Sequence, residues 1–338
     1  MPNISIIIPS YNSEKTILKT LKAVKKQEGL LEPPEIIVVD DGSKDNTVNI
    51  LKKIVGIKVI TQKNAGPAKA RNSGAKVAEG EILVFTDSDT VPHKDWINNL
   101  TDPFSNPDVA ATTGTYSIEN KENKLANIIQ AEIEDKHNNY SEYIAFGGSY
   151  NLAIKKKLFF EIGGFNEVYK NASGEDVDIC YKILNKGHKI RFVKNAIVGH
   201  FHPSNLVKYL KTQFRHGFWR AKLYYDHPDK ISGDDYTGYK EAFETIFACF
   251  TIISPIIYLL KKIKFSSKPK RNLPLFENIF LLPIIGLLFI ELCFTSKIYL
   301  KNNKNKNFPF LYAILVFFLR AIFRTLGFIK GLFYFLHK

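Results

Sequence analysis

Short apolar runs alternate with amphipathic stretches along the first two thirds of the chain. Such runs are typical of buried β-strands, and segments with helical periodicity separate the first four of them. Strand and helix units that repeat about every 20 to 30 residues predict an α/β fold with a mainly parallel sheet. Strands are expected at residues 4–8, 35–39, 57–60 and 82–85, and helices at 13–27 (with Ser13 as N-cap), 46–54 and 67–78.

The pattern is less regular from residue 108 to residue 230. The pair Gly147-Gly148 interrupts a β-rich stretch, and a loop with Gly174 precedes an amphipathic segment. We expect residues 1–230 to form one catalytic domain. Its further strands are predicted at residues 108–115, 151–154 and 190–198, and its further helices at 121–138, 177–185 and 204–225.

Three long apolar stretches follow, at residues 242–260, 273–294 and 308–336. The first two approach the roughly 20 residues that a helix needs to cross the hydrocarbon layer. In the third, Arg320 and Arg324 lie one turn apart, which predicts an interfacial helix or side chains that snorkel to the surface. We expect residues 231–338 to form two or three membrane-associated helices; buried helices of a soluble domain are the alternative.

The net charge of +14 admits nucleic acid, an anionic membrane or an acidic substrate as a partner. Because the chain has no recognisable nucleic-acid module, membrane lipids are expected and nucleic acid is not. If the first two apolar stretches form a hairpin, the basic loop between them lies outside, against the positive-inside rule, so the topology stays open. That loop carries Lys261, Lys262, Lys264, Lys268, Lys270 and Arg271.

Cysteine usage indicates the compartment. Cys180, Cys249 and Cys293 are too scattered for a disulfide framework, which fits a reducing environment. The first residues lead directly into a predicted strand and lack the pattern of a secretory leader. We therefore expect the protein at the cell membrane, with its catalytic domain on the cytoplasmic side.

Two carboxylates, Asp87 and Asp89, come directly after the apolar run 82–85. Residues two positions apart on an extended segment point to the same side. The carboxyl ends of strands form the edge at which open α/β sheets bind ligands. The pair therefore suits a hard divalent cation that is shared with a diphosphate.

Two further motifs fall on the same edge. Asp40-Asp41-Gly42-Ser43 follows the second predicted strand, where it could form a turn and a helix N-cap, or one of its two carboxylates could accept hydrogen bonds from a uracil or a ribose. Gly66 precedes the helix that carries Arg71. The amino end of that helix and the cation could hold a phosphate or a base carbonyl, although Arg71 could also be a solvated helix residue.

Asp176 begins a predicted helix, where it could be a cap or a general base that takes the proton of an attacking hydroxyl. Glu175 could position Asp176 or bind the acceptor. His200 and His202 follow the last predicted strand. Isolated histidines are usually structural, but an imidazole beside the two carboxylates would give a mixed oxygen and nitrogen site that suits Mn²⁺ better than Mg²⁺.

Taken together, these motifs are similar to those of the family 2 inverting glycosyltransferases. The resemblance covers about residues 3–225 and implies a GT-A fold, a nucleotide-diphosphate sugar donor and a divalent cation, Mn²⁺ or Mg²⁺. It rests on Ile8-Pro9-Ser10-Tyr11-Asn12, Val38-Val39-Asp40-Asp41-Gly42-Ser43, residues 66–74, Asp87-Ser88-Asp89 and Gly174-Glu175-Asp176.

The resemblance also implies roles for single residues. Asp176 would be the base, with Glu175 beside it. Asp87 and Asp89 would hold the metal and the diphosphate, with His200 as a further metal ligand and His202 as the second choice. The nucleotide would be bound by Pro9, Tyr11, Asp41, Gly66, Arg71 and Asp87.

One motif departs from the family. Its processive membrane synthases carry Gln-x-x-Arg-Trp after the base, whereas this chain has Gln213-Phe214-Arg215-His216-Gly217-Phe218-Trp219-Arg220. A non-processive enzyme is therefore expected, in which Arg215 or His216 could still serve the diphosphate or the acceptor.

The expected reaction moves a sugar, from a UDP-sugar by preference, to a hydroxyl of a lipid-linked or cell-surface glycan. A polyprenyl-phosphate sugar synthase is an alternative, but a phosphate acceptor is already ionised and needs no base. Two other classes stay open. They are a sugar-nucleotide nucleotidyltransferase and a non-catalytic membrane scaffold that binds sugar nucleotides.

Overall fold

The computed structural model describes residues 3–170, 173–231, 239–264, 281–301 and 308–337. The chain divides into two compact units. The first comprises Met1–Glu122 and Ile133–His202, and the second comprises Asn123–Glu132 and Pro203–Lys338. The division falls before the helix at Leu206–Asp226, which the sequence analysis grouped with the catalytic domain.

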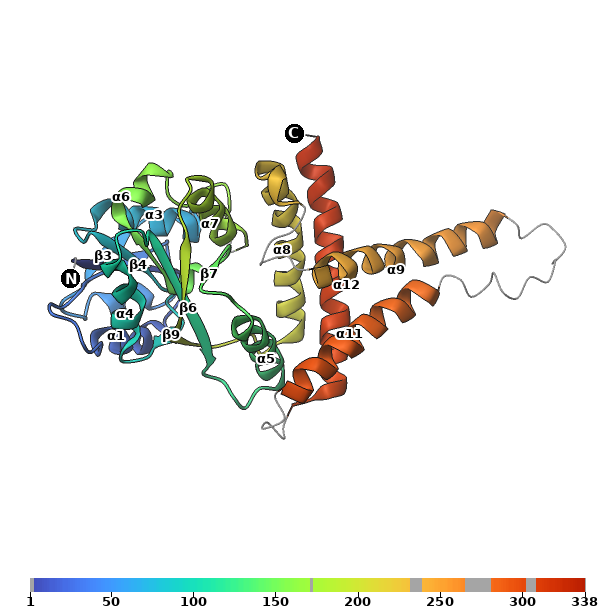
Figure 1. Ribbon diagram of the computed structural model, residues 1–338, viewed down its shortest axis with the longest axis horizontal. Coiled ribbons are helices and arrows are strands. Elements are labelled where there is room, and N and C mark those ends of the chain that lie inside the picture. The colour runs from blue at the N-terminus through green and yellow to red at the C-terminus, as the bar shows by residue number, and fades with distance from the viewer. Residues whose placement is uncertain (1–2, 171–172, 232–238, 265–280, 302–307, 338) are drawn as a thin grey trace. The chain divides into compact units, whose positions relative to one another are not determined.

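The first unit is built on one mixed sheet (Figure 1). Among the described residues its strand order is β3-β2-β1-β4-β8-β6-β9-β5, and β7 pairs with β9. The bounds are β1 Ile4–Ser10, β2 Glu35–Asp40, β3 Lys58–Thr61, β4 Ile82–Phe85, β5 Thr90–Pro92, β6 Ala111–Ile118, β7 Tyr143–Ile144, β8 Leu152–Lys155 and β9 Ile190–His200.

The parallel part of the sheet is formed by β3, β2, β1 and β4, as the strand and helix repeat predicts. The other half mixes directions. Strand β8 runs antiparallel to both β4 and β6, while β6 and β9 are parallel. An apolar run carries no information about strand direction. The sequence therefore did not indicate where the sheet changes from parallel to antiparallel pairing.

Helices cover both faces of the sheet because the central strands are apolar on both sides. In β1, Ile7 packs with the α3 residue Ala75 on one face, whereas Ile6 and Ile8 pack with Trp96 of α4 on the other. The helices of this unit are α1 Ile17–Lys25, α2 Thr47–Leu51, α3 Pro67–Val77, α4 Trp96–Thr101, α6 Lys156–Glu161 and α7 Glu175–Asn185; α5 Lys124–Asn138 belongs partly to each unit.

The expectation that Ser13 caps the first helix is wrong. Helix α1 begins at Ile17, and the Ser13 carbonyl accepts the amides of Thr16 and Ile17 at 3.0 and 2.9 Å. The Ser13 hydroxyl instead lies 2.7 Å from the hydroxyl of Ser88, which stands between the two carboxylates after β4. A turn therefore precedes α1 and ties it to the acidic motif.

The second unit contains the helices α8 Leu206–Asp226, α9 Tyr239–Lys264, α11 Leu282–Lys301 and α12 Phe310–Leu336. In the described part of this unit, three segments are long and apolar enough to cross a membrane, namely Lys240–Leu260, Leu282–Lys301 and Phe310–Leu336. The expected start of the second apolar stretch, at residues 273–280, and the basic residues at 268–271 lie outside the described residues.

Helices α8 and α12 lie side by side and approach closely at glycines (Figure 1). A Cβ atom on Gly327 would lie 1.9 Å from the carbonyl oxygen of Phe214, and one on Gly217 would lie 1.9 Å from that of Arg324. Small residues that let backbones meet are typical of helix packing in membranes.

The snorkelling predicted for Arg320 is wrong. Its side chain is buried, and its guanidinium pairs with Glu132 of α5 and, at 3.4 Å, with Glu244 of α9. Lys240 also pairs with Glu244 and lies 3.7 Å from Glu291 of α11. The charge is buried because its partners come from other helices, which the pattern of one apolar stretch does not reveal.

Candidate active site

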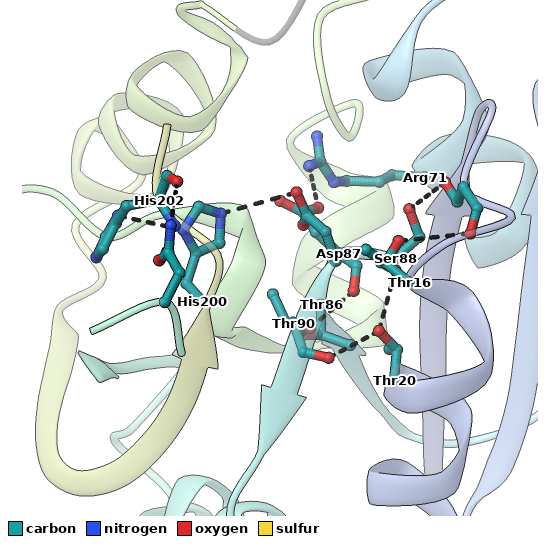
Figure 2. A network of polar contacts seen from close by, with 12 residues as sticks. Thr16, Thr20, Arg71, Thr86, Asp87, Ser88, Thr90, His200 and His202 are labelled. Atoms are coloured by element: carbon teal, nitrogen blue, oxygen red, sulfur yellow. Dashed lines mark hydrogen bonds and ion pairs between the residues drawn. The ribbon is translucent and has the colours of Figure 1, made fainter. Parts of the chain in front are cut away.

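The acidic motif occupies the carboxyl end of β4, next to β1 and β2. Asp87, Ser88 and Asp89 follow β4 directly, and the β1 end pairs with β2 through Ser10 and Asp40. Thr90 closes the turn, since its hydroxyl donates to the Asp87 carbonyl at 2.7 Å. Figure 2 shows the motif between Arg71 and His200. The edge predicted for the ligand therefore carries the predicted side chains.

Asp41 and Gly66, both expected at the nucleotide, meet in this structure. The Asp41 carboxylate accepts the amides of Ala65 and Gly66 at 2.9 and 2.8 Å, and the side-chain amide of Gln62 at 2.7 Å. Gly66 has a φ of 98°, and a Cβ atom there would lie 2.5 Å from the carbonyl oxygen of Lys170. Only glycine fits this turn.

Two further residues expected at the nucleotide, Pro9 and Tyr11, lie at the carboxyl end of β1. Pro9 belongs to β1 and pairs in register with Val39 of β2. Tyr11 follows β1, and its side chain is 46% exposed. That Pro9 and Tyr11 bind the nucleotide stays a prediction. The exposed Tyr11 ring is accessible to a ligand at this edge of the sheet.

Arg71 of α3 is only 2% exposed and is not a solvated helix residue. It donates to Asp87 Oδ1 at 2.8 Å and to Glu175 Oε1 at 3.2 Å (Figure 2 shows the contact with Asp87). Burial opposes its charge, but the carboxylates of Asp87, Asp176 and Glu175 outweigh burial and raise the Arg71 pKa. Arg71 therefore bridges the acidic motif and the start of α7.

Asp176 is the second residue of α7. Glu175, the first, accepts the amides of Ser173 and Gly174 at 2.8 and 3.1 Å, which fixes the start of the helix. Asp176 Oδ1 is buried and, among the described residues, has no hydrogen bond of normal geometry. Burial and the neighbouring Glu175 raise the Asp176 pKa to about 7, against the opposing effects of Arg71 and the Ser149 hydroxyl. A carboxylate with this pKa can accept a proton near neutral pH.

His200 ends β9 and faces the acidic motif, with its Nε2 atom 3.9 Å from Asp89 Oδ2. The Asp89 side chain is 47% exposed. Burial of its carboxyl group raises the Asp89 pKa, and the His200 imidazole opposes that rise. One carboxylate oxygen and one imidazole nitrogen thus converge on a position that a ligand can reach.

This donor set fits a divalent cation that arrives with its substrate. Within the described part of the chain, no group of three or more His, Cys, Asp or Glu side chains lies close enough to hold a metal by itself. Mn²⁺ or Mg²⁺ at a phosphate site usually takes one or two protein ligands and completes its shell with phosphate oxygens and water. Asp89 and His200 could supply those ligands, while Asp87 is turned toward Arg71.

Sequence reasoning missed a pair of stacked tyrosines. The rings of Tyr116 on β6 and Tyr150 lie 3.5 Å apart at an interplanar angle of 13°. Burial raises both phenol pKa values well above their usual range, and the carboxylates of Asp87 and Asp176 add to this. The glycine pair was the available signal, since a Cβ atom on Gly148 would lie 1.9 Å from the Tyr150 ring.

Arg215 and His216, considered for the diphosphate or the acceptor, lie on α8 of the second unit. Their contact with a substrate stays a prediction. His202, the second choice for a metal ligand, is buried behind His200, with the two Nδ1 atoms 3.3 Å apart.

Comparison with known proteins identifies the family of the chain. The Glycosyl transferase family 2 profile matches residues 5–173, which is half of the chain. The chain therefore belongs to Glycosyl transferase family 2, and its first unit has a GT-A-like α/β fold.

Two curated relatives show how similar the chain is to known glycosyltransferases. The pre-mycofactocin glycosyltransferase of Mycobacterium tuberculosis is 27% identical over 243 residues, which cover 68% of this chain and 49% of the relative. The chain thus spans about half the length of that relative. The O-antigen chain rhamnosyltransferase RfbN of Salmonella typhimurium is 28% identical over 237 residues, covering 64% of this chain and 72% of the relative.

Among solved structures, the mannosyltransferase PcManGT from Pyrobaculum calidifontis, in complex with GDP-Man and Mn²⁺, superposes with a TM-score of 0.57. The match covers 98% of this chain and 87% of that protein, at 16% sequence identity. At this identity the similarity concerns the fold alone.

Proposed function

We propose that the protein transfers a sugar from a nucleotide-diphosphate donor, a UDP-sugar by preference, to a hydroxyl of a lipid-linked or cell-surface glycan. The reaction inverts the anomeric centre. The observation that carries this proposal is the buried Asp176 carboxylate, with a pKa near 7, tied by Glu175 and Arg71 to Asp87. The proposed base and the proposed metal-binding motif are thus connected through the ion pairs of Arg71.

In the proposed reaction, Asp176 takes the proton of the acceptor hydroxyl. The hydroxyl oxygen attacks the anomeric carbon from the face opposite the diphosphate, whose bond to the sugar breaks as the new bond forms. A divalent cation, when bound, neutralises the charge that builds on the departing diphosphate. Asp89 and His200 would hold this cation, and Asp87 would contribute to the metal and diphosphate site.

Arg71 and Glu175 act in this scheme by position. Arg71 is salt-bridged on both sides and holds the start of α7 against the loop after β4. Asp176 next to Glu175 thereby keeps its place relative to the leaving diphosphate. The nucleotide is proposed to be surrounded by Tyr11, Pro9, Asp41 and Gly66. The exposed Tyr11 ring is available to contact the nucleobase.

The membrane assignment is part of the proposal. The three long apolar helices found among the described residues support an acceptor at the bilayer. The first unit is proposed to lie on the cytoplasmic side of the cell membrane. The relative from Salmonella is described as acting on an O-antigen chain, which is a precedent for a glycan acceptor. We favour a hydroxyl over a polyprenyl phosphate because an ionised phosphate would leave the buried base at Asp176 without a task.

The pH dependence of nucleoside diphosphate release tests the assignment of the base. A base is active when deprotonated, so kcat/KM is expected to rise with pH through a midpoint near the Asp176 pKa of about 7. In Glu175→Gln one negative neighbour of Asp176 is lost, its pKa falls, and the midpoint moves to lower pH. Both proteins are measured at saturating Mn²⁺.

The exposed Glu79 provides the matched control, because Glu79→Gln removes the same charge away from the site. Its profile should coincide with that of the unmodified protein. A midpoint that stays in place or moves to higher pH in Glu175→Gln would contradict Asp176 as the base.

A further inference from the structure

The two histidines after β9 occupy different positions around one contact. Nε2 of His200 faces Asp89 at 3.9 Å, whereas Nδ1 of His200 lies 3.3 Å from Nδ1 of His202 (Figure 2). His202 therefore meets His200 at the ring nitrogen that does not face the acidic motif. The His200 imidazole therefore faces the acidic motif, and the His202 imidazole lies on the other side of His200.

The backbone of His202 is held on both sides by one side chain. Asn120 accepts the amide of His202 at 3.0 Å, and it donates to the carbonyl of His202 at 2.8 Å. These bonds continue the pairing of β6 with β9 beyond its last pair, Ile118 with His200. The His202 side chain is buried. Its imidazole is therefore fixed in place before any ligand binds.

The tyrosine pair sets the planes of both imidazoles. The Tyr116 ring lies 4.8 Å from the His200 ring and meets the His202 ring edge-on at 5.7 Å. Tyr150 stacks on Tyr116, and its ring lies against Gly148, where a Cβ atom would be 1.9 Å away. Tyr116 thus contacts both Tyr150 and His200, and this packing restricts rotation of the His200 ring.

We propose that His202 is a positioning residue that accepts a hydrogen bond from Nδ1–H of His200 and thereby directs the Nε2 lone pair toward a divalent cation. A neutral imidazole carries its proton on one of two nitrogens, and the partner of the first nitrogen decides which lone pair is free. Partners of this kind orient metal-binding histidines in proteins. His202 is thus not a second metal ligand. The inference rests on the proposed metal-dependent function.

Binding of Mn²⁺ tests the inference without turnover. The full-length protein in detergent is titrated with Mn²⁺ at excess UDP, and free Mn²⁺ is followed by electron paramagnetic resonance. His202→Phe keeps a ring but removes the acceptor, and its Mn²⁺ affinity is expected to fall by about 10- to 100-fold. His202→Asn places an amide oxygen near the position of Nδ1 and should retain affinity within about threefold of the unmodified protein.

The outcomes separate the inference from the function on which it rests. Equal Mn²⁺ affinity in His202→Phe and the unmodified protein would overturn the inference and leave the proposed function intact. If the unmodified protein binds Mn²⁺ no better than Asp89→Ala, the proposed metal site itself is wrong. Should His202→Phe not fold, Asn120→Ala replaces it. Releasing the His202 backbone is expected to weaken Mn²⁺ binding several-fold, and an unchanged affinity would overturn the inference.

Discussion

Replacing Asp176 with asparagine is expected to reduce the turnover number for nucleoside diphosphate release by about 10²- to 10⁴-fold, the usual contribution of a general base. Asparagine matches the size of aspartate but cannot take the proton of the acceptor hydroxyl. The bridge from Arg71 to Asp87 and Glu175 does not involve Asp176, so the donor site is expected to persist. The affinity for the nucleotide sugar should therefore change little.

The comparison needs turnover and donor binding in the same preparation. Asp108→Asn, at an exposed position outside the site, is the matched control and should keep normal turnover. Near-normal transfer by Asp176→Asn with unchanged donor affinity would show that another group accepts the proton. Loss of both transfer and donor binding would instead indicate a damaged site.

The second large effect concerns stability. In Arg320→Met the carboxylates of Glu132 and Glu244 lose a buried cation, and removal of one partner from a buried ion pair typically costs about 3 to 5 kcal/mol. We expect a loss of this size in the free energy of unfolding, measured by circular dichroism of the full-length protein in detergent.

Arg324, one turn further along α12, provides the matched control. Its side chain is 32% exposed; it donates to Gln213 Oε1 at 2.7 Å and lies 3.8 Å from the partly exposed Glu241 carboxylate. Arg324→Met is expected to cost about 1 to 2 kcal/mol, because it removes one hydrogen bond and a long, partly exposed ion pair. Adding Glu132→Gln and Glu244→Gln to Arg320→Met should restore part of the lost stability, because the unpaired charges are removed. Equal losses in the two arginine variants would contradict a buried network centred on Arg320.

The sequence predicted those parts of the fold that depend on neighbouring residues. Strand β4 was predicted with the bounds that the structure has, because a short apolar run between turn signals is typical of a strand buried on both faces of a sheet. The carboxylates after β4 could be placed for the same reason. By contrast, α4 spans only Trp96–Thr101, which is too short to show helical periodicity, and β5 is shorter still.

Contacts between distant segments could not be predicted. Arg71 and Glu175 are 104 positions apart, and only the folded chain reveals that one guanidinium serves both Glu175 and Asp87. The stacking of Tyr116 on Tyr150 depends on how β6 lies beside the loop before β8. Family motifs located the site residues, but these long-range contacts determine how the side chains are held and charged.

The measurement that tests the central claim most directly is the release of nucleoside diphosphate from a panel of UDP-, GDP- and dTDP-sugars. The full-length protein in detergent is supplied with Mn²⁺ and a crude lipid extract as the source of acceptor. The proposed function predicts release from one class of donor, together with transfer of its sugar to the extract, and loss of both in Asp89→Ala and after chelation of the metal. Release of pyrophosphate, or transfer that persists in Asp89→Ala without metal, would contradict a metal-dependent glycosyltransferase.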